Sequence, residues 1–132
     1  LFKNLPALDN LSSAVKDKVQ RTNFLKGIDG RIINVRSNHS ALNFLIQSCG
    51  SIIVKKATCL LHEKLFTKYK YDEDWSMVAH IHDELQLQVK ESLVHEIGKL
   101  AVQVVKDTQE IFNLRCPLDA EYKVGRNWAE TH

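Results

Sequence analysis

Residues 77–89 restrict the fold more than any other part of the sequence, because apolar and polar side chains alternate on both sides of an acidic pair. Neighbouring side chains on a strand point to opposite faces, so this alternation predicts two strands, each with one covered face. Cross-strand neighbours share a face, so apolar residues must oppose apolar residues. A three-residue loop at 82–84 satisfies this rule by pairing Ile81 with Leu85, whereas a two-residue turn at 83–84 breaks it.

His82, Asp83 and Glu84 therefore form the expected tip of a tight hairpin. Two adjacent carboxylates repel each other, and such loops usually carry Gly or Asn at a position with positive φ, which this one lacks. Both costs are easier to understand if a cation binds there, and carboxylate oxygens favour Mg²⁺ or Mn²⁺. An acidic pair is also an ordinary soluble turn, so the pattern alone leaves both interpretations open.

A zinc site is a competing interpretation of the same hairpin, because His80-Ile81-His82 is similar to the start of the HxHxDH motif of metallo-β-lactamase-like hydrolases. That motif requires Asp at position 84 and His at position 85. This chain has Glu84 and Leu85 there. The mismatch at both positions disfavours a self-contained metal hydrolase.

Residues 39–68 predict a long helix, because apolar residues recur at spacings of three and four over this length. His39, Asn43 and Gln47 lie four residues apart and therefore share one polar face. The Asn and Gln amides can reach the acceptors of a DNA minor groove, whose pattern varies little with base sequence. The solvated face of an ordinary amphipathic helix gives the same stripe, so this alternative also stays open.

The other segments complete an α+β fold. The expected elements are a helix over residues 6–21 with Asn4 as its cap, a hairpin within 23–35, the long helix capped by Ser37 or Asn38, a helix capped by Ser92, and a last strand over 118–124. This order predicts a small antiparallel sheet with helices packed on one face, and leaves its opposite, polar face open for a ligand. Arg31 and Arg36 precede the long helix and are candidate phosphate contacts, although exposed arginines are also common without a role.

Size and composition place few limits on function. The 132 residues suffice for one compact domain and are too few for two. The formal net charge of +2 is too small to predict nucleic-acid binding, so a basic surface would have to come from the placement of charges. No continuous apolar run approaches the roughly 20 residues of a membrane span, so no membrane association is expected.

Four stretches, in this order, resemble the family A DNA polymerases, and most closely the replicative enzymes of short-tailed bacteriophages. They are GIDGR at 27–31 with VRS at 35–37, HSALNFLIQSCG at 39–50, AHIHDELQ at 79–86, and LDAEYKVGRNW at 118–128 with the terminal His132. Residues 1–22 match more loosely. The resemblance implies one domain over residues 1–132, the carboxy-terminal part of a polymerase palm, with a helix at 1–22 preceding a palm core at 23–132.

The resemblance also implies roles at the acidic tip. Asp83 would bind the catalytic divalent ions, and Glu84 would be a secondary or water-mediated carboxylate near the same site. His82 would steady the primer terminus. His132 would reach back toward the active centre.

On the long helix, the resemblance assigns minor-groove contacts with the nascent base pairs to Asn43 and Gln47, and extends the same contact surface to His39. His39 agrees with the phage branch of the family and departs from the Arg of the bacterial repair branch. Arg31 and Arg36 would complete the DNA-binding residues. We expect this stripe and the acidic tip to face the same cleft.

The implied reaction is template-directed nucleotidyl transfer, in which two Mg²⁺ ions act on primer–template DNA and a dNTP. It needs a second aspartate on a preceding strand and a fingers helix, and these 132 residues contain neither an Asp-Tyr-Ser run nor an Arg-xxx-Lys-xxxxxx-Tyr-Gly run. We therefore expect polymerase activity only together with the fingers, the thumb and the first catalytic strand.

The expected location is the cytoplasm of a bacterium or of a phage-infected host cell. A thioredoxin-like processivity factor, acting through a thumb that this chain lacks, remains an open option.

The alternative function is a non-catalytic module that binds the DNA minor groove. The paired carboxylates favour the polymerase, because a pure binder has no use for them.

Overall fold

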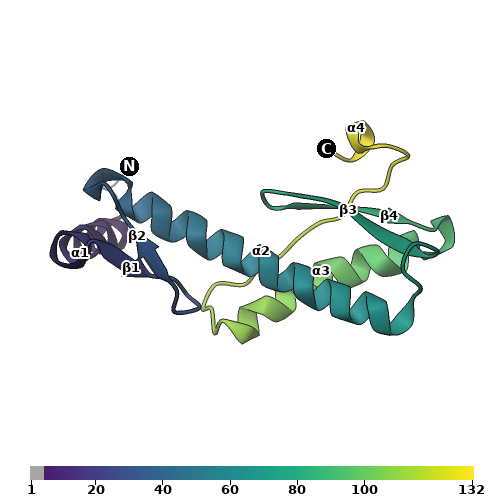
Figure 1. The fold of residues 1–132 in the computed structure, drawn as a ribbon, viewed down its shortest axis with the longest axis horizontal. Helices are drawn as coiled ribbons and strands as arrows, with labels where there is room; N and C mark the ends of the chain where they lie inside the picture. The colour runs from purple at the N-terminus through teal and green to yellow at the C-terminus, as the bar shows by residue number, and fades with distance from the viewer. Residues whose placement is uncertain (1–4) are drawn as a thin grey trace. The chain divides into compact units, whose positions relative to one another are not determined.

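The structure is a computed structural model that describes residues 5–132 (Figure 1). Its helices and strands are α1 (Pro6–Thr22), β1 (Phe24–Lys26), β2 (Ile32–Asn34), α2 (Ala41–Lys68), β3 (Trp75–Ile81), β4 (Glu84–Val89), α3 (Val94–Ile111) and α4 (Trp128–Thr131). Short 3-10 turns at Asn38–Ser40 and Glu91–Leu93 precede α2 and α3. This content confirms the predicted α+β class.

The contacts group the chain into two compact units, Leu1–Ile52 and Ile53–His132, with the boundary inside α2. Each unit has its own cluster of buried apolar residues. The small sheet is likewise divided into two antiparallel pairs, β1–β2 and β3–β4. The assignment of the chain to one domain over residues 1–132 stays a prediction.

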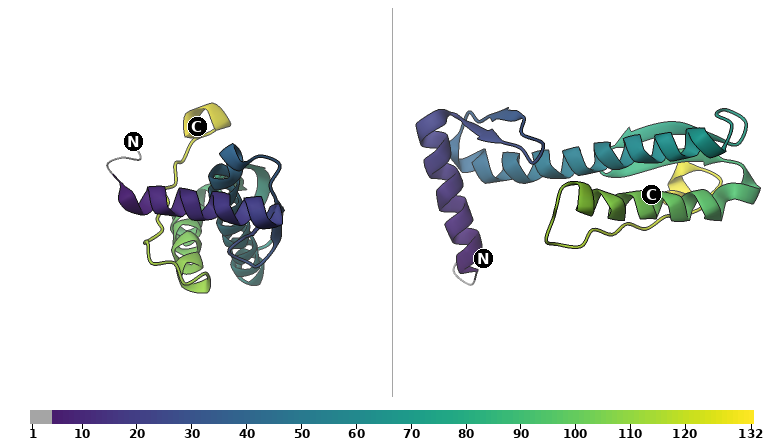
Figure 2. Two further views of the ribbon diagram at one scale, coloured as in Figure 1. Left: turned by 90° about the vertical axis from the view of Figure 1, so that its left-hand side faces the viewer. Right: turned by 90° about the horizontal axis from the view of Figure 1, so that it is seen from below.

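In the first unit, α1 packs against the β1–β2 hairpin (Figure 2). Val15 and Val19 lie one turn apart on α1 and are buried in the same cluster as Leu25 of β1. The helix ends at Asn23, whose positive φ of 58° turns the chain into β1 while its N–H bonds the Val19 carbonyl at 2.8 Å. The expected cap at the other end, Asn4, lies outside the described residues.

In the second unit, α3 and the carboxy-terminal part of α2 lie side by side on one face of the β3–β4 hairpin (Figures 1 and 2). Leu61 and Leu65 of α2 meet Ile97 and Val104 of α3, and all four are buried. Trp75, at the base of the hairpin, joins this cluster and is only 2% exposed. Helices therefore cover one face of this sheet, as the sequence predicts.

The helix caps differ from the prediction. Ser92 lies inside the 3-10 turn Glu91–Leu93, and α3 begins after Leu93 without a side-chain cap. Ser37 precedes the turn Asn38–Ser40 and also makes no side-chain cap bond. In both cases a 3-10 turn bonds the first backbone groups before the α-helix begins, so no side-chain cap forms.

The strand predicted over residues 118–124 is absent from the described structure, which has irregular backbone there. A strand needs a neighbour whose backbone groups complete its ladder, and no described strand pairs with this segment. The alternation of side chains over residues 118–124 was therefore not enough to form a strand. The segment is instead held to α3 by side chains, including an ion pair of 3.1 Å between Lys106 and Asp119.

One described helix, over residues Asn38–Lys68, has the length and mean hydropathy needed to cross a membrane. The search for an unbroken apolar run missed this helix, because polar residues such as Asn43 and Gln47 interrupt its apolar residues. The mean hydropathy of the helix stays high despite these interruptions. The core helix of a soluble protein passes the same test, so this finding is weak evidence for a membrane span.

Replacing Trp75 with Ala is expected to lower the free energy of unfolding by about 3–5 kcal/mol, the usual cost of emptying a buried aromatic site. The Trp75 Nε1 has no hydrogen-bond partner among the described residues, so the loss is one of packing alone. Trp75→Phe keeps much of the ring and should lose far less. Urea unfolding followed by circular dichroism measures both variants, and equal losses would contradict this explanation.

Candidate functional site

The tip of the β3–β4 hairpin is a two-residue turn and not the predicted three-residue loop. Ile81 pairs with Glu84, which leaves only His82 and Asp83 in the turn. The rule that apolar residues oppose apolar residues applies where helices cover the sheet. Ile81 is 36% exposed, so the tip lies beyond that cover and the rule has no force there.

A β-bulge at Val78 separates the tip from the base of the hairpin. On the base side Met77 pairs with Leu87, so apolar residues face each other where the helices cover them. On the tip side Ala79 pairs with Gln86, so the register there is shifted by one residue from the register of the base. The bulge therefore lets the base keep its packing while the tip closes in a tight turn.

His82 takes the positive-φ position of this turn, with φ of 54°. A residue with a side chain costs roughly 1–2 kcal/mol in that conformation, so the turn is strained beside the acidic pair. Strained backbone of this kind clusters at functional sites. The predicted contact of His82 with a primer terminus stays a prediction.

The two adjacent carboxylates have different surroundings. Asp83 is exposed, and within residues 5–132 its carboxylate has no hydrogen-bond or ion-pair partner. Glu84 Oε1 accepts hydrogen bonds from the Gln86 amide and, at 2.9 Å, from Trp128 Nε1. Glu84 Oε2 lies 3.0 Å from His132 Nδ1. One carboxylate is therefore free and the other is tethered.

These contacts favour the charged form of Glu84. Hydrogen bonds from Gln86, His132 and Trp128 hold the pKa of the Glu84 carboxyl below its usual value, although partial burial opposes them. A lowered pKa means that the stabilising contribution is present above the usual pKa of about 4.3 and is lost as the pH falls below it. Glu84 is therefore ionised at neutral pH.

The polar face of the β3–β4 sheet, which the sequence predicted to be open, is covered at the tip end of the hairpin. The terminal segment, residues 128–132, lies on the side of the hairpin away from α3 (Figure 1). Besides its contacts with Glu84, Thr131 Oγ1 bonds Gln86 Oε1 at 3.4 Å. Glu84 and Gln86 point to the same face because they are two positions apart on β4, so the terminal segment covers the tip end of that face.

Sequence reasoning placed His132 near the acidic tip but missed Trp128 and Gln86. A local signal for the terminal helix was present, because Asn127 and Glu130 have the spacing of a capping box. In the structure the Asn127 side chain accepts from the Glu130 N–H at 3.2 Å. That signal predicts the helix but not which distant residue its Trp contacts.

In the first unit, Asn43 and Gln47 are exposed on one face at the start of α2, and His39 is exposed in the 3-10 turn just before that helix. Ile46, next to Gln47 in this part of α2, is 54% exposed and does not belong to the core cluster of the first unit. The expected position of the stripe in a cleft with the acidic tip stays a prediction.

The two candidate phosphate contacts also differ. Arg31 Nε bonds Asp29 Oδ2 at 2.7 Å within the turn between β1 and β2. This bond uses one of the five N–H donors of the guanidinium, so four remain for another partner. Arg36 is exposed at the end of the hairpin, without a side-chain partner in the described part of the chain.

Asp83 and Glu84 fit one half of a magnesium site. Mg²⁺ usually takes one or two carboxylates and completes its shell with water and phosphate oxygens. Asp83 offers both oxygens, whereas Glu84 Oε1 already accepts two bonds and only Oε2 has capacity left. Within the described residues no cluster of three His, Cys, Asp or Glu side chains suits a metal. Asp83 is therefore the main candidate ligand, and further ligands must come from elsewhere.

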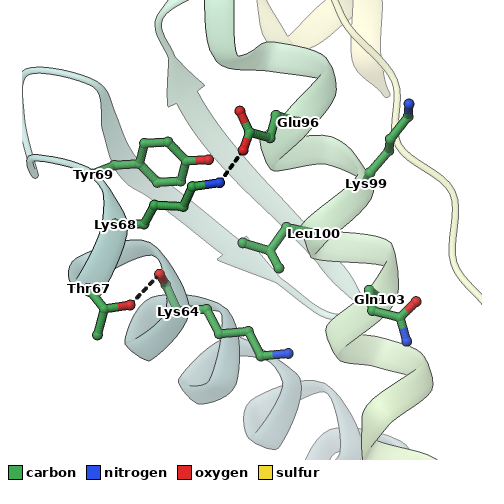
Figure 3. A pocket seen from close by; sticks show the side chains of 8 residues that line it. All are labelled: Lys64, Thr67, Lys68, Tyr69, Glu96, Lys99, Leu100 and Gln103. Atoms are coloured by element: carbon green, nitrogen blue, oxygen red, sulfur yellow. Dashed lines mark hydrogen bonds and ion pairs between the residues drawn. The ribbon is translucent and has the colours of Figure 1, made fainter.

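A groove of about 520 Å³ lies between the end of α2 and the start of α3 (Figure 3). Its lining includes Lys64, Lys68 and Lys99, but Lys68 is ion-paired with Glu96. The groove contains none of the predicted site residues. It therefore adds nothing to the acidic tip.

Residues 9–130 match the sequence pattern of DNA polymerase family A. The chain belongs to DNA polymerase family A. The DNA-directed DNA polymerase of Enterobacteria phage T3 is 40% identical over 116 residues, and that of Escherichia phage T7 is 37% identical over 113 residues. Each alignment covers 83% of this chain but only 16% of the relative, so this family A chain spans a small part of the length of those polymerases.

The fold of this family A chain also occurs in a solved structure, the POL domain of Pol1 from M. smegmatis in complex with DNA primer-template and dNTP. The TM-score is 0.72, and the match covers 94% of this chain and 22% of that chain. The sequence identity is 19%, so this similarity supports the fold alone.

Replacing His82 with Gly is expected to raise the free energy of unfolding by about 0.5–1 kcal/mol. Relief of the positive-φ strain, roughly 1–2 kcal/mol, exceeds the entropy cost of Gly, roughly 0.5–1 kcal/mol. Asp83→Gly is the matched control, because Asp83 has no positive φ and should only lose stability. Urea unfolding measures both, and destabilisation by His82→Gly would show that the turn carries no strain.

Proposed function

We propose that this chain is the carboxy-terminal palm segment of a DNA-directed DNA polymerase and supplies one of the carboxylates that hold the two catalytic Mg²⁺ ions. The observation that carries the proposal is the Asp83 carboxylate, exposed and unpartnered at a strained turn, in a member of family A. Glu84, whose oxygens are largely engaged, is the secondary or water-mediated carboxylate of the same site.

Asp83, with Glu84 beside it, would hold Mg²⁺, which when bound would supply activation of the primer 3′-hydroxyl and neutralisation of the charge on the leaving pyrophosphate. This chain would contribute by holding the Asp83 carboxylate in position. Asp83 presents both carboxylate oxygens at the end of a hairpin whose base is fixed in the core. His82, next to it on the turn, is placed to bond the primer terminus, and His132 to keep Glu84 oriented.

The proposed DNA contacts come from the first unit. Asn43 and Gln47 offer amide donors to minor-groove acceptors, and His39, exposed in the 3-10 turn just before α2, is the third residue of this contact surface. Arg31 and Arg36 bind backbone phosphates, which position the duplex without reading its sequence. Support for primer–template DNA and a dNTP as substrates comes from the Pol1 domain, which was solved in complex with both.

The chain by itself is proposed to be inactive, because the two-metal reaction needs a second aspartate and a nucleotide-binding fingers helix. Its partner is therefore the rest of the polymerase, and its place of action is the cytoplasm of a bacterium or phage-infected cell.

A minor-groove-binding module without catalysis is the second candidate. The free Asp83 carboxylate favours the polymerase, because binding to DNA phosphates gains nothing from an exposed negative charge.

In the polymerase that contains this chain, Asp83→Asn is expected to lower the rate of single-nucleotide addition by about 100-fold or more. The amide keeps the shape of the side chain but removes the charge that would hold Mg²⁺. The affinity for primer–template DNA should stay within about twofold, because the variant removes no donor to the phosphates. Rapid-quench primer extension and fluorescence anisotropy measure the two quantities.

Asp17→Asn is the control for this experiment, because it removes one exposed carboxylate from α1. It should leave both quantities unchanged. Full extension by the Asp83→Asn enzyme, or extension by the 132-residue chain alone, would refute the assigned role.

Asn43→Ala and Gln47→Ala are each expected to weaken duplex binding by about fivefold, the usual worth of one hydrogen bond. The loss should be similar for different duplex sequences, because minor-groove acceptors vary little. Neither variant should change the slope of log affinity against log salt, whereas Arg31→Ala should make it shallower. Anisotropy titrations at several salt concentrations test this, with Gln20→Ala as the exposed-amide control.

A further inference from the structure

The chain after α3 runs back along that helix as a strap, which we define as residues 113–127. Leu118 N–H bonds Gln109 Oε1 at 3.4 Å, and Asp119 pairs with Lys106. Farther along the strap Tyr122 Oη lies 3.2 Å from His95 Nδ1. Later strap residues therefore contact earlier residues of α3, from Gln109 back to His95. The strap therefore runs antiparallel to α3, toward the end of the helix that adjoins the β3–β4 hairpin (Figure 1).

Tyr122 fixes the strap on α3 through a contact that only glycine permits. A Cβ built at Gly98 would lie 2.4 Å from Tyr122 Cδ2 and 2.5 Å from Cε2, distances that carbon atoms do not tolerate. Gly in a helix interior costs about 1 kcal/mol relative to Ala, so its presence needs a reason. The close approach of the Tyr122 ring to the Gly98 backbone supplies one.

The terminal turn is held in shape by bonds between its Glu130 and the last two residues of the strap, Arg126 and Asn127. Asn127 Nδ2 donates to Glu130 Oε1 at 2.9 Å, and the Arg126 N–H donates to Glu130 Oε2 at 2.8 Å. Together with the Glu130 N–H bond to Asn127 Oδ1, these contacts form a reciprocal cap. Trp128 and His132 project from this turn with their rings 5.9 Å apart, edge to face.

We propose that the Trp128 indole is a positioning residue for Glu84, placed there by the Tyr122–Gly98 contact. Trp128 Nε1 donates to Glu84 Oε1 at 2.9 Å across 44 positions of sequence. With the Gln86 and His132 contacts it fixes the carboxylate on both oxygens. Glu84 is thereby kept from turning toward Asp83. This role rests on the proposed function, because it matters only if Asp83 holds a metal.

Residues that orient the groups around a metal usually change metal affinity by about 10–100-fold when they are replaced. A Trp that merely packs in place would act through its ring. A Trp that positions Glu84 acts through its N–H. Trp128→Phe separates the two roles, because it keeps an aromatic ring and removes only the donor.

The first test uses proton–nitrogen NMR of the 132-residue chain without DNA or metal. The chain has two tryptophans, and the buried Trp75 Nε1, which has no partner among the described residues, is an internal reference. Glu84→Ala should move the Trp128 indole resonance upfield and speed its exchange with solvent, while the Trp75 resonance stays in place. Gly98→Ala should do the same from a distance by displacing Tyr122.

Gly50→Ala is the matched control, because it adds the same methyl group to a helix where the new Cβ meets nothing within 4 Å beyond its chain neighbours and the helix's own backbone. It should leave the Trp128 resonance unchanged. Tyr122→Ala is a second way to release the strap if Gly98→Ala does not fold. A Trp128 resonance that stays in place in Glu84→Ala, or in both folded strap variants, overturns the proposal.

The second test measures single-nucleotide addition against Mg²⁺ concentration in the polymerase that contains this chain. Trp128→Phe should raise the half-saturating Mg²⁺ concentration by about tenfold. An unchanged Mg²⁺ dependence overturns the positioning role. If Asp83→Asn also leaves addition intact, the proposed function itself has failed, whereas the NMR result still decides whether the strap holds Trp128 on Glu84.

Discussion

The apolar contact between the base of the β3–β4 hairpin and the paired helices is the constraint on which the second unit depends. Two strands alone are marginally stable in water and need a covered face. Leu61 and Ile97 of the helices provide that cover and pack with Trp75 of β3, and all three are almost completely buried. Because the cover stops short of the tip, the turn is free of core packing. It can therefore hold a strained His82 and an exposed Asp83.

The two neighbouring carboxylates illustrate how secondary structure separates chemical roles. Asp83 lies in the turn and faces solvent, whereas Glu84 is the first residue of β4 and points to the face that the terminal segment covers. Repulsion between adjacent charges is reduced when one of them is held by donors. Under the proposed function, this division leaves the Asp83 carboxylate open to a metal while Glu84 stays oriented beside it.

Local periodicity accounts for most of the elements that the sequence predicts. The helices expected at 6–21 and 39–68 are α1 (Pro6–Thr22) and α2 (Ala41–Lys68), because apolar spacing along a helix is a property of neighbouring residues. The predicted strand register at the hairpin tip was wrong because that register is not set by neighbouring residues. It depends on where helix cover ends, and the bulge at Val78 marks that limit without leaving a pattern in the sequence.

By itself the sequence determined the α+β class, the acidic turn and the resemblance to family A, since each follows from residues close together in the chain. Only the tertiary structure decided that residues 118–124 form a strap and not a strand, and that Trp128 meets Glu84. The physical reason is distance along the chain. A hydrogen bond across 44 positions depends on how α3, Gly98 and Tyr122 guide the backbone, and no local pattern records that path.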